Sequence, residues 1–419
     1  MSADPGSAVP GGPTERPRGV TSGPPVLDLS GIRIADAGRV GPKVARLGQL
    51  AHAGWRVPDG YAVTVDALTG WLPQAIRQDL DRLLASRPAA TGEHPHHRQH
   101  EHEAHHRHLA LMAARAGELI EGQPLPAWLA DAIAAAHERL ASRTGHGDAL
   151  KVAVRSSAVS EDGASASFAG QYATYLGVTG VPDVLTHVRK CWASGFSAHA
   201  LEYRRRAGSI TVEEHRLAVG VLELVDVRSA GVVFTMDPVS GDRSRLVVEG
   251  NWGFGESVVS GQVTPDHWEV DRATGHILAE HVAAKRTWSV FDERQGAVTL
   301  QPLPRELAEQ ACLAAQEVRY LCRAAVEIED AEDGAPQDVE WAIARGLPFP
   351  DSVYILQHRP ETTWSPAQQE PAQQEPAPHA PPPGAPGPET ASSPAPDPAP
   401  KAFDPVAYAL RNVFRVPGT

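Results

Sequence analysis

An arginine and two serines follow the short apolar run Val152–Val154, and they are well suited to bind phosphate. A guanidinium grips phosphate oxygens through parallel N–H groups, and hydroxyls add neutral donors. A hydrophobic core has no need of such a set at the end of a strand. Arg155, Ser156 and Ser157, with the polar loop that continues to Gly170, therefore predict an anion site.

A second polar set lies on two strands expected at 338–343 and 354–360, joined by a loop. Because side chains alternate between the faces of a strand, Glu340 points away from the apolar face of its strand, and Gln357 and Arg359 share one face. Carboxylate and amide oxygens suit Mg²⁺, and arginine suits a triphosphate. The alternative is a surface hairpin with an ordinary Glu–Arg pair, and these residues alone favour neither interpretation.

Two weaker motifs accompany these sets. Gly41-Pro42-Lys43 opens a helix indicated by the apolar spacing of residues 44–51, and its lysine can reach phosphate as a point charge. Proline is tolerated in a first helical turn, but it removes one N–H that could face phosphate. Residues 251–266 form a glycine-rich segment, and glycines allow the backbone to approach a ligand closely.

Together and in this order, the segments resemble the N-terminal nucleotide-binding domain of the phosphoenolpyruvate synthase and pyruvate phosphate dikinase family, over about residues 30–363. The resemblance implies an α+β, ATP-grasp fold of two subdomains with ATP and Mg²⁺ between them. It also implies transfer of a phosphoryl group to a histidine on a mobile swivelling domain, with AMP and phosphate released in the synthase type.

The motif matches carry the family's nucleotide contacts to the following positions: Lys43, Arg155, Gly170, Thr174, Glu340, Gln357 and Arg359. Among them, the resemblance gives Lys43, Arg155 and Arg359 catalytic roles and makes Glu340 and Gln357 the metal ligands. One departure is Leu222-Glu223-Leu224, where the family usually has Gln-Lys-Met. This departure puts recognition of the base or sugar in doubt.

The acceptor histidine is the larger departure, because neither His199 nor His358 lies in a suitable acceptor loop. We therefore expect a phosphotransferase subunit that is incomplete without a separate phosphohistidine partner. One alternative is direct phosphorylation of a small molecule, as the related rifamycin-inactivating phosphotransferases perform. Another is a nucleotide-binding regulatory or scaffold protein with weakened catalysis.

Composition limits the class of protein. The chain has 419 residues, 42% of them hydrophobic, and a net charge of −13, which argues against nucleic acid or an anionic membrane as the main partner. No run of eighteen apolar residues predicts a membrane span. Three scattered cysteines are typical of reduced thiols in a cytoplasmic protein.

The expected organisation is a disordered extension, two subdomains, a Pro/Ala-rich linker and a short amphipathic tail helix, with these bounds: 1–27, 28–215, 216–363, 364–402 and 403–419. Helices are expected over 66–145, 181–207 and 304–328, with five strands between 217 and 282. An insertion with eight histidines, 93–108, interrupts the first helical region. Histidine clusters can bind zinc or nickel, but a solvated low-complexity segment is the favoured interpretation.

Overall fold

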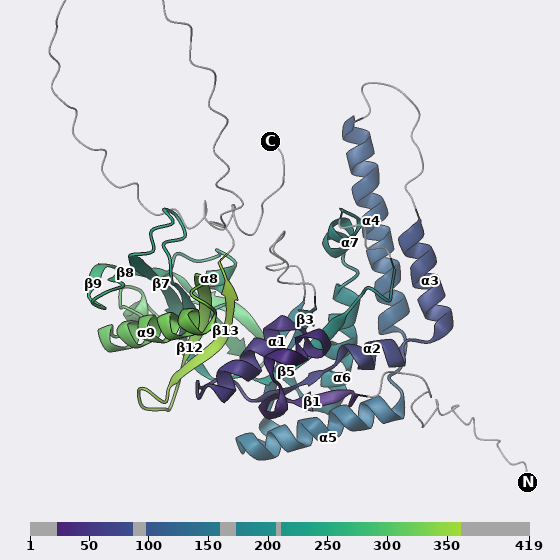
Figure 1. Ribbon diagram of the computed structural model, residues 1–419, viewed down its shortest axis with the longest axis horizontal. Coiled ribbons are helices and arrows are strands. Elements are labelled where there is room, and N and C mark those ends of the chain that lie inside the picture. Colours follow the sequence, from purple (N-terminus) through teal and green to yellow (C-terminus); the bar gives the residue numbers. More distant parts are fainter. Residues whose placement is uncertain (1–22, 87–97, 160–172, 207–210, 362–419) are drawn as a thin grey trace, which may run out of the picture.

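The computed structural model of the chain describes residues 23–86, 98–159, 173–206 and 211–361. It is a mixed α/β protein whose two main sheets lie side by side, with most helices around the first sheet (Figure 1). Gly170, most of the expected N-terminal extension, the first part of the histidine-rich insertion, the linker and the tail helix lie outside the described residues. In the described part, no helix combines the length and apolar character needed to cross a bilayer.

The first sheet has five antiparallel strands in the order β1-β2-β5-β3-β4. Their bounds are Val26–Asp28 (β1), Gly60–Val63 (β2), Lys151–Ala158 (β3), Thr174–Thr179 (β4) and Leu217–Glu223 (β5). β5 is buried on both faces, which explains its nearly continuous apolar sequence. Antiparallel pairing in both sheets is compatible with the α+β fold that the resemblance implies.

Helices pack on one face of the first sheet around a large core that contains Trp192. These helices are α2 (Val65–Trp71), α3 (Gln74–Ala85), α4 (Arg98–Glu121), α5 (Ala127–Thr144), α6 (Gly180–Ser194) and α7 (Ala198–Arg206). Within this core the rings of Trp71 and Trp192 stack 4.9 Å apart. A geometry of this kind adds to the stabilisation from buried area.

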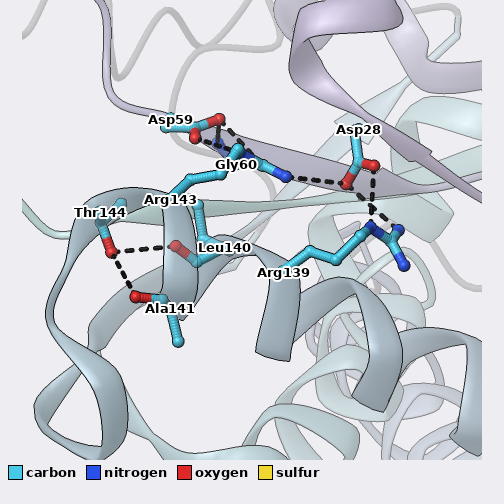
Figure 2. Close-up of polar contacts among 8 residues, drawn as sticks. All are labelled: Asp28, Asp59, Gly60, Arg139, Leu140, Ala141, Arg143 and Thr144. Atoms are coloured by element: carbon cyan, nitrogen blue, oxygen red, sulfur yellow. Dashed lines mark hydrogen bonds and ion pairs between the residues drawn. The ribbon is translucent and has the colours of Figure 1, made fainter.

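Two arginines of α5 tie that helix to the strands beneath it (Figure 2). Arg139 donates to Asp28 of β1 at 3.1 and 3.3 Å, and Arg143 donates to Asp59, just before β2, at 2.7 and 3.1 Å. Arg143 also lies 3.6 Å from Asp28, so one carboxylate serves both arginines. Arg139 and Arg143 are four residues apart on α5, so their side chains project from the same face of the helix and bind both β1 and the start of β2.

The second sheet has six antiparallel strands in the order β13-β12-β6-β7-β8-β9. Their bounds are Val227–Phe234 (β6), Arg245–Trp252 (β7), Asp266–Asp271 (β8), Ile277–His281 (β9), Gln337–Ala344 (β12) and Val353–Pro360 (β13). Helix α9 (Ala315–Ala331) packs on one face through a core that includes Val339 and Trp341. Short helix α8 (Glu256–Val259) contacts β6 and β7.

Helix α1 (Ala37–His52) lies where the two sheets meet, and it contacts β3, β5 and β13. The helix is interrupted at Gly41, whose φ of 74° and ψ of 156° are not helical. Pro42 consequently begins the longer segment, a position where its fixed φ and missing N–H cost nothing. The helix predicted to open at Gly41-Pro42-Lys43 is therefore the second, longer segment of α1, which begins at Pro42.

The structure differs from the sequence predictions at several elements. Helix α4 begins at Arg98, so the interruption predicted for 93–108 is wrong over residues 98–108. The helix predicted for 181–207 is two helices, and the break between them includes Gly195, against which the ring of His215 packs. The strands β10 (Thr287–Asp292) and β11 (Ala297–Pro302) were not predicted. Their mixed, half-buried sequences carry little periodic signal.

The helix predicted from residue 304 instead begins at Ala315, and a buried ion pair explains the delay. Asp266 and Lys285 are fully buried and joined at 2.5 Å. The same carboxylate accepts the backbone N–H of Cys312 at 2.8 Å. This bond holds the segment before α9 in a non-helical conformation and satisfies a buried charge.

Candidate functional site

Arg155 lies within β3, and this corrects the expectation that the strand ends at Val154. Ser156 and Ser157 continue the strand and are buried. The Ser156 hydroxyl donates to the carbonyl of Ala173 at 3.2 Å, so it fastens β3 to the start of β4. Of the three polar residues that the sequence indicated, Arg155 alone is partly exposed.

The register of the first sheet places Thr174 and Gly220 on either side of Arg155. Directly paired residues of antiparallel strands project from the same face. Thr174 is exposed there, and Gly220 has no side chain, which leaves room for Arg155 and for Val44 of α1. Arg155 and Thr174, which lie 19 residues apart in sequence, are therefore neighbours on one face of the sheet.

A chain of hydrogen bonds runs from Arg155 across to the second sheet. Arg155 Nη2 donates to Gln357 Oε1, and Gln357 Nε2 donates to Glu340 Oε1 at 3.3 Å. Glu340 and Gln357 are paired in register on β12 and β13. Three residues identified from separate segments of the sequence therefore converge where the two sheets meet.

Asp338 was not among the sequence candidates, although it lies beside them. Arg359 donates to Asp338 Oδ2 through Nε at 2.8 Å and Nη2 at 2.5 Å. The other carboxylate oxygen, Oδ1, is buried and has no hydrogen-bond partner in the described part of the chain. The signal that could have identified it is its spacing of two from Glu340, which places both carboxylates on one face of β12.

Behind this face, a network of buried polar residues fixes the ends of the strands. The backbone N–H of Thr235 donates to the carbonyl of Gln337, and the backbone N–H of Gln337 donates to the Thr235 hydroxyl. The side-chain oxygen of Gln337 contacts His358 Nδ1 at 3.0 Å. Arg272 joins Thr235 to Glu329 of α9. A fully bonded buried network of this kind makes the positions of Asp338 and Arg359 well defined.

His358 is buried in this network. Its burial and the nearby charge of Arg46 lower the pKa of His358 to about 4. The ring is thus neutral near pH 7 and enclosed by the protein, whereas His199 lies exposed on α7. The location of His358 agrees with the expectation that it does not lie in an acceptor loop.

The segment Gly41-Pro42-Lys43 approaches the site through Gly41. A Cβ at Gly41 would lie 2.5 Å from the carbonyl oxygen of Ser157 and 2.7 Å from its carbon. α1 can therefore touch β3 only because residue 41 has no side chain. Lys43 is partly buried and lies in the first turn after this contact, two residues along α1.

We expect Gly41→Ala to destabilise the protein on the order of 3 kcal/mol, because the new methyl group meets backbone atoms and the φ of 74° is strained for alanine. Gly54→Ala is the matched control, since its φ is 90° but nothing lies within 4 Å of its Cβ. That control should cost only about 1 kcal/mol. Chemical denaturation measures both, and equal losses would contradict the close contact with Ser157.

Two other segments have structural roles in the described chain. Leu222 is buried and packs with the core that surrounds α1, where the family's glutamine was expected to contact nucleotide. In the glycine-rich segment, Gly253 has a φ of 79° and lies against the carbonyl of Ser289. Close packing therefore accounts for this glycine.

Two histidines of α4 connect this helix to neighbouring segments. His105 lies 2.6 Å from Glu202 of α7, and His108 contacts Ser86 after α3 at 3.3 Å. No group of three or more potential metal ligands occurs among the described residues. The first histidines of the insertion lie outside those residues.

Comparison with known proteins gives a family. The model of the pyruvate phosphate dikinase AMP/ATP-binding domain matches residues 37–379. A probable phosphoenolpyruvate synthase of Staphylothermus marinus is 34% identical over 360 residues, covering 81% of this chain and 41% of that protein. One of Methanothermobacter thermautotrophicus is 36% identical over 341 residues, covering 80% and 46%.

A rifampicin phosphotransferase of Streptomyces sp is 35% identical over 351 residues, covering 83% of this chain and 37% of that protein. The chain thus spans less than half the length of each of these three relatives. The match to the ATP-binding domain extends over most of the chain and includes the second sheet, every strand of the first sheet except β1, and the converging residues. The protein therefore belongs to the family of the pyruvate phosphate dikinase AMP/ATP-binding domain.

Proposed function

We propose that this chain binds MgATP where its two sheets meet, in an ATP-grasp arrangement, and passes a phosphoryl group to a histidine on a separate swivelling-domain protein. The observation that carries the proposal is the hydrogen-bonded chain from Arg155 through Gln357 to Glu340. It brings a phosphate-binding cation from the first sheet to oxygen ligands on the second. Phosphoryl transfer depends mainly on such positioning and on charge neutralisation.

The residues present fit a magnesium ion. Glu340, Gln357 and Asp338 supply hard oxygen donors from neighbouring strands, and the buried Asp338 Oδ1 lacks a hydrogen-bond partner in the described chain. An orphaned buried carboxylate oxygen is costly unless a ligand or cation satisfies it. When bound, the ion would neutralise phosphate charge.

The cationic residues have distinct tasks in this proposal. Arg155 exchanges its bond to Gln357 for phosphate oxygens, which also releases the Gln357 oxygen for the ion. Arg359 stays oriented by Asp338 and directs other N–H donors of its guanidinium to phosphate. Lys43 reaches the phosphates from the first turn of the longer α1 segment, and Thr174 adds a neutral donor beside Arg155.

The acceptor is proposed to lie on another polypeptide. His358 is enclosed, and its neutral ring already contacts Gln337. In the synthase-type reaction, ATP and water give AMP, phosphate and one phosphoryl group on the acceptor histidine. The separate partner would carry that histidine to and from the nucleotide.

Product analysis tests this reaction. With ATP labelled in its β- and γ-phosphates and the partner domain added, we expect AMP, phosphate and label on the partner's histidine. Chromatography of the nucleotides and acid lability of the labelled protein provide the measurements. ADP as the sole nucleotide product would contradict dikinase-type chemistry.

A second candidate is direct phosphorylation of a small molecule. It is favoured by the similarity to the rifampicin phosphotransferase, which matches 83% of this chain at 35% identity. The same labelled ATP discriminates the two. Label in a phosphorylated small-molecule product other than inorganic phosphate, with no labelled protein intermediate, would support this candidate in place of a phosphohistidine partner.

A further inference from the structure

The β10–β11 hairpin belongs to the second half of the chain but reaches the first sheet. Its base is anchored at the glycine-rich segment: Asn251 Nδ2 donates to the carbonyl of Thr287 at 3.0 Å, and Phe254 N donates to that of Ser289 at 2.8 Å. The lack of a side chain at Gly253 permits this contact, since a Cβ there would lie 3.1 Å from the Ser289 carbonyl carbon. The hairpin is therefore firmly joined to β7 and the residues that follow it.

The other end of β10 interlocks with β3 and β4. Phe291 lies directly over Gly177 of β4, where a Cβ would be 2.7 Å from the ring's Cδ2. Lys151, the first residue of β3, has its Nζ 4.1 Å from the centre of the same ring and 2.5 Å from Glu293 Oε1. The space left by Gly177 and the Lys151 ammonium over the ring together hold the Phe291 side chain in place, and the ion pair to Glu293 fixes that ammonium.

Glycine is suited to position 177 for two reasons. Its φ is 79°, in the left-handed region where glycine has no steric penalty. Any larger residue would also displace Phe291. The fit between hairpin and strand therefore depends on the absence of one side chain.

We propose that Phe291, held by Gly177 and Lys151, is a positioning residue that fixes the β3–β4 edge relative to the second sheet and so sets the place of Arg155 and Thr174 for ATP. The inference rests on the proposed function of that site. Lys151 and Arg155 lie on β3, and Thr174 and Gly177 lie on β4. The contact of Phe291 with Gly177 and Lys151, here called the clasp, lies at one end of this strand pair and therefore restrains the other end.

The clasp matters most once nucleotide is bound. The hydrogen bond from Arg155 to Gln357 is a direct link between the β3–β4 edge and the second sheet. In the proposed complex both residues turn to phosphate and metal, and that link is given up. The hairpin then holds the β3–β4 strand pair at the distance from the second sheet that Arg155 needs. This restraint lowers the free-energy cost of ordering the site when ATP binds.

Four variants test the clasp. Phe291→Ala removes the ring, and Gly177→Ala displaces it. Gly275→Ala is the matched glycine control, with a φ of 69° and nothing within 4 Å, and Leu278→Ala is an exposed apolar control on β9. Calorimetry with MgATP should show the dissociation constant rise about fivefold for each clasp variant, and hardly at all for the controls.

The double variant Phe291→Ala/Gly177→Ala should bind ATP no more weakly than either single variant, because both substitutions remove the same interaction.

Hydrogen exchange without nucleotide gives an independent readout. In Phe291→Ala the amides of β4, residues 174–179, should exchange faster while those of β9 stay unchanged. Unaltered ATP affinity, or additive losses in the double variant, would overturn the positioning role. If the wild-type chain failed to bind MgATP, the proposed function would fall, and unchanged exchange at β4 would then overturn the clasp as well.

Discussion

Arg359→Ala is expected to weaken binding of MgATP about 10- to 150-fold, because a charge-assisted hydrogen bond to phosphate is worth on the order of 1.5–3 kcal/mol. The same substitution leaves the buried Asp338 carboxylate without the arginine that contacts it at 2.8 and 2.5 Å. We therefore also expect a loss of stability on the order of 2–3 kcal/mol, at the low end for a broken pair because solvent reaches Arg359. Calorimetry and chemical denaturation measure the two effects separately.

A double variant distinguishes the two causes. Asp338→Asn/Arg359→Ala removes both charges, so much of the lost stability should return. ATP binding should stay weak, because Arg359 is still missing and an amide at position 338 attracts the magnesium ion less than a carboxylate does. Weak binding that recovers together with stability would show that Arg359 acts through the fold. Undiminished ATP affinity in Arg359→Ala itself would remove this residue from the nucleotide site.

Glu340→Gln tests the metal. The substitution keeps the shape of the side chain and an oxygen that can accept from Gln357, but it removes the negative charge that attracts a cation. ATP binding should lose most of its dependence on Mg²⁺. A metal ion contributes several kcal/mol to stabilising charge in a transition state, so partner-dependent turnover should fall on the order of 100-fold or more.

The matched control is Glu327→Gln, an exposed position on α9. It removes the same charge away from β12 and should leave the magnesium dependence unchanged. Titration of Mg²⁺ at fixed ATP provides the comparison. If Glu340→Gln behaves like this control, Glu340 does not hold the ion.

Several site residues could be predicted from the sequence because their signals are local. Arg155 follows an apolar run, and Glu340 lies between two apolar residues of its strand. Gln357 and Arg359 are two positions apart, so period-two spacing predicts that they share a face. In the structure Glu340 is paired with Gln357, and Arg155 contacts Gln357. Whether Gly170 joins them stays a prediction, since it lies outside the described residues.

Other features depended on contacts between distant segments. Ser156 and Ser157 looked like phosphate donors, yet β3 continues through them, and pairing with β5 buries both. The β10–β11 hairpin has weak strand patterning of its own and is stabilised by docking at Gly253 and Gly177. Propensity and periodicity do not register such interactions, because they depend on which surfaces meet.

The sequence by itself determined the polar residues, their strand faces and the order of motifs that identifies the family, because each depends on neighbours within a few positions. The tertiary structure alone decided that Arg155 meets Gln357, 202 residues away. It alone decided that Asp338 pairs with Arg359 and keeps one carboxylate oxygen without a hydrogen-bond partner among the described residues. It also decided that Gly41 admits α1 against β3. These contacts follow from packing two sheets around one helix, where close approach and burial select partners that no local pattern specifies.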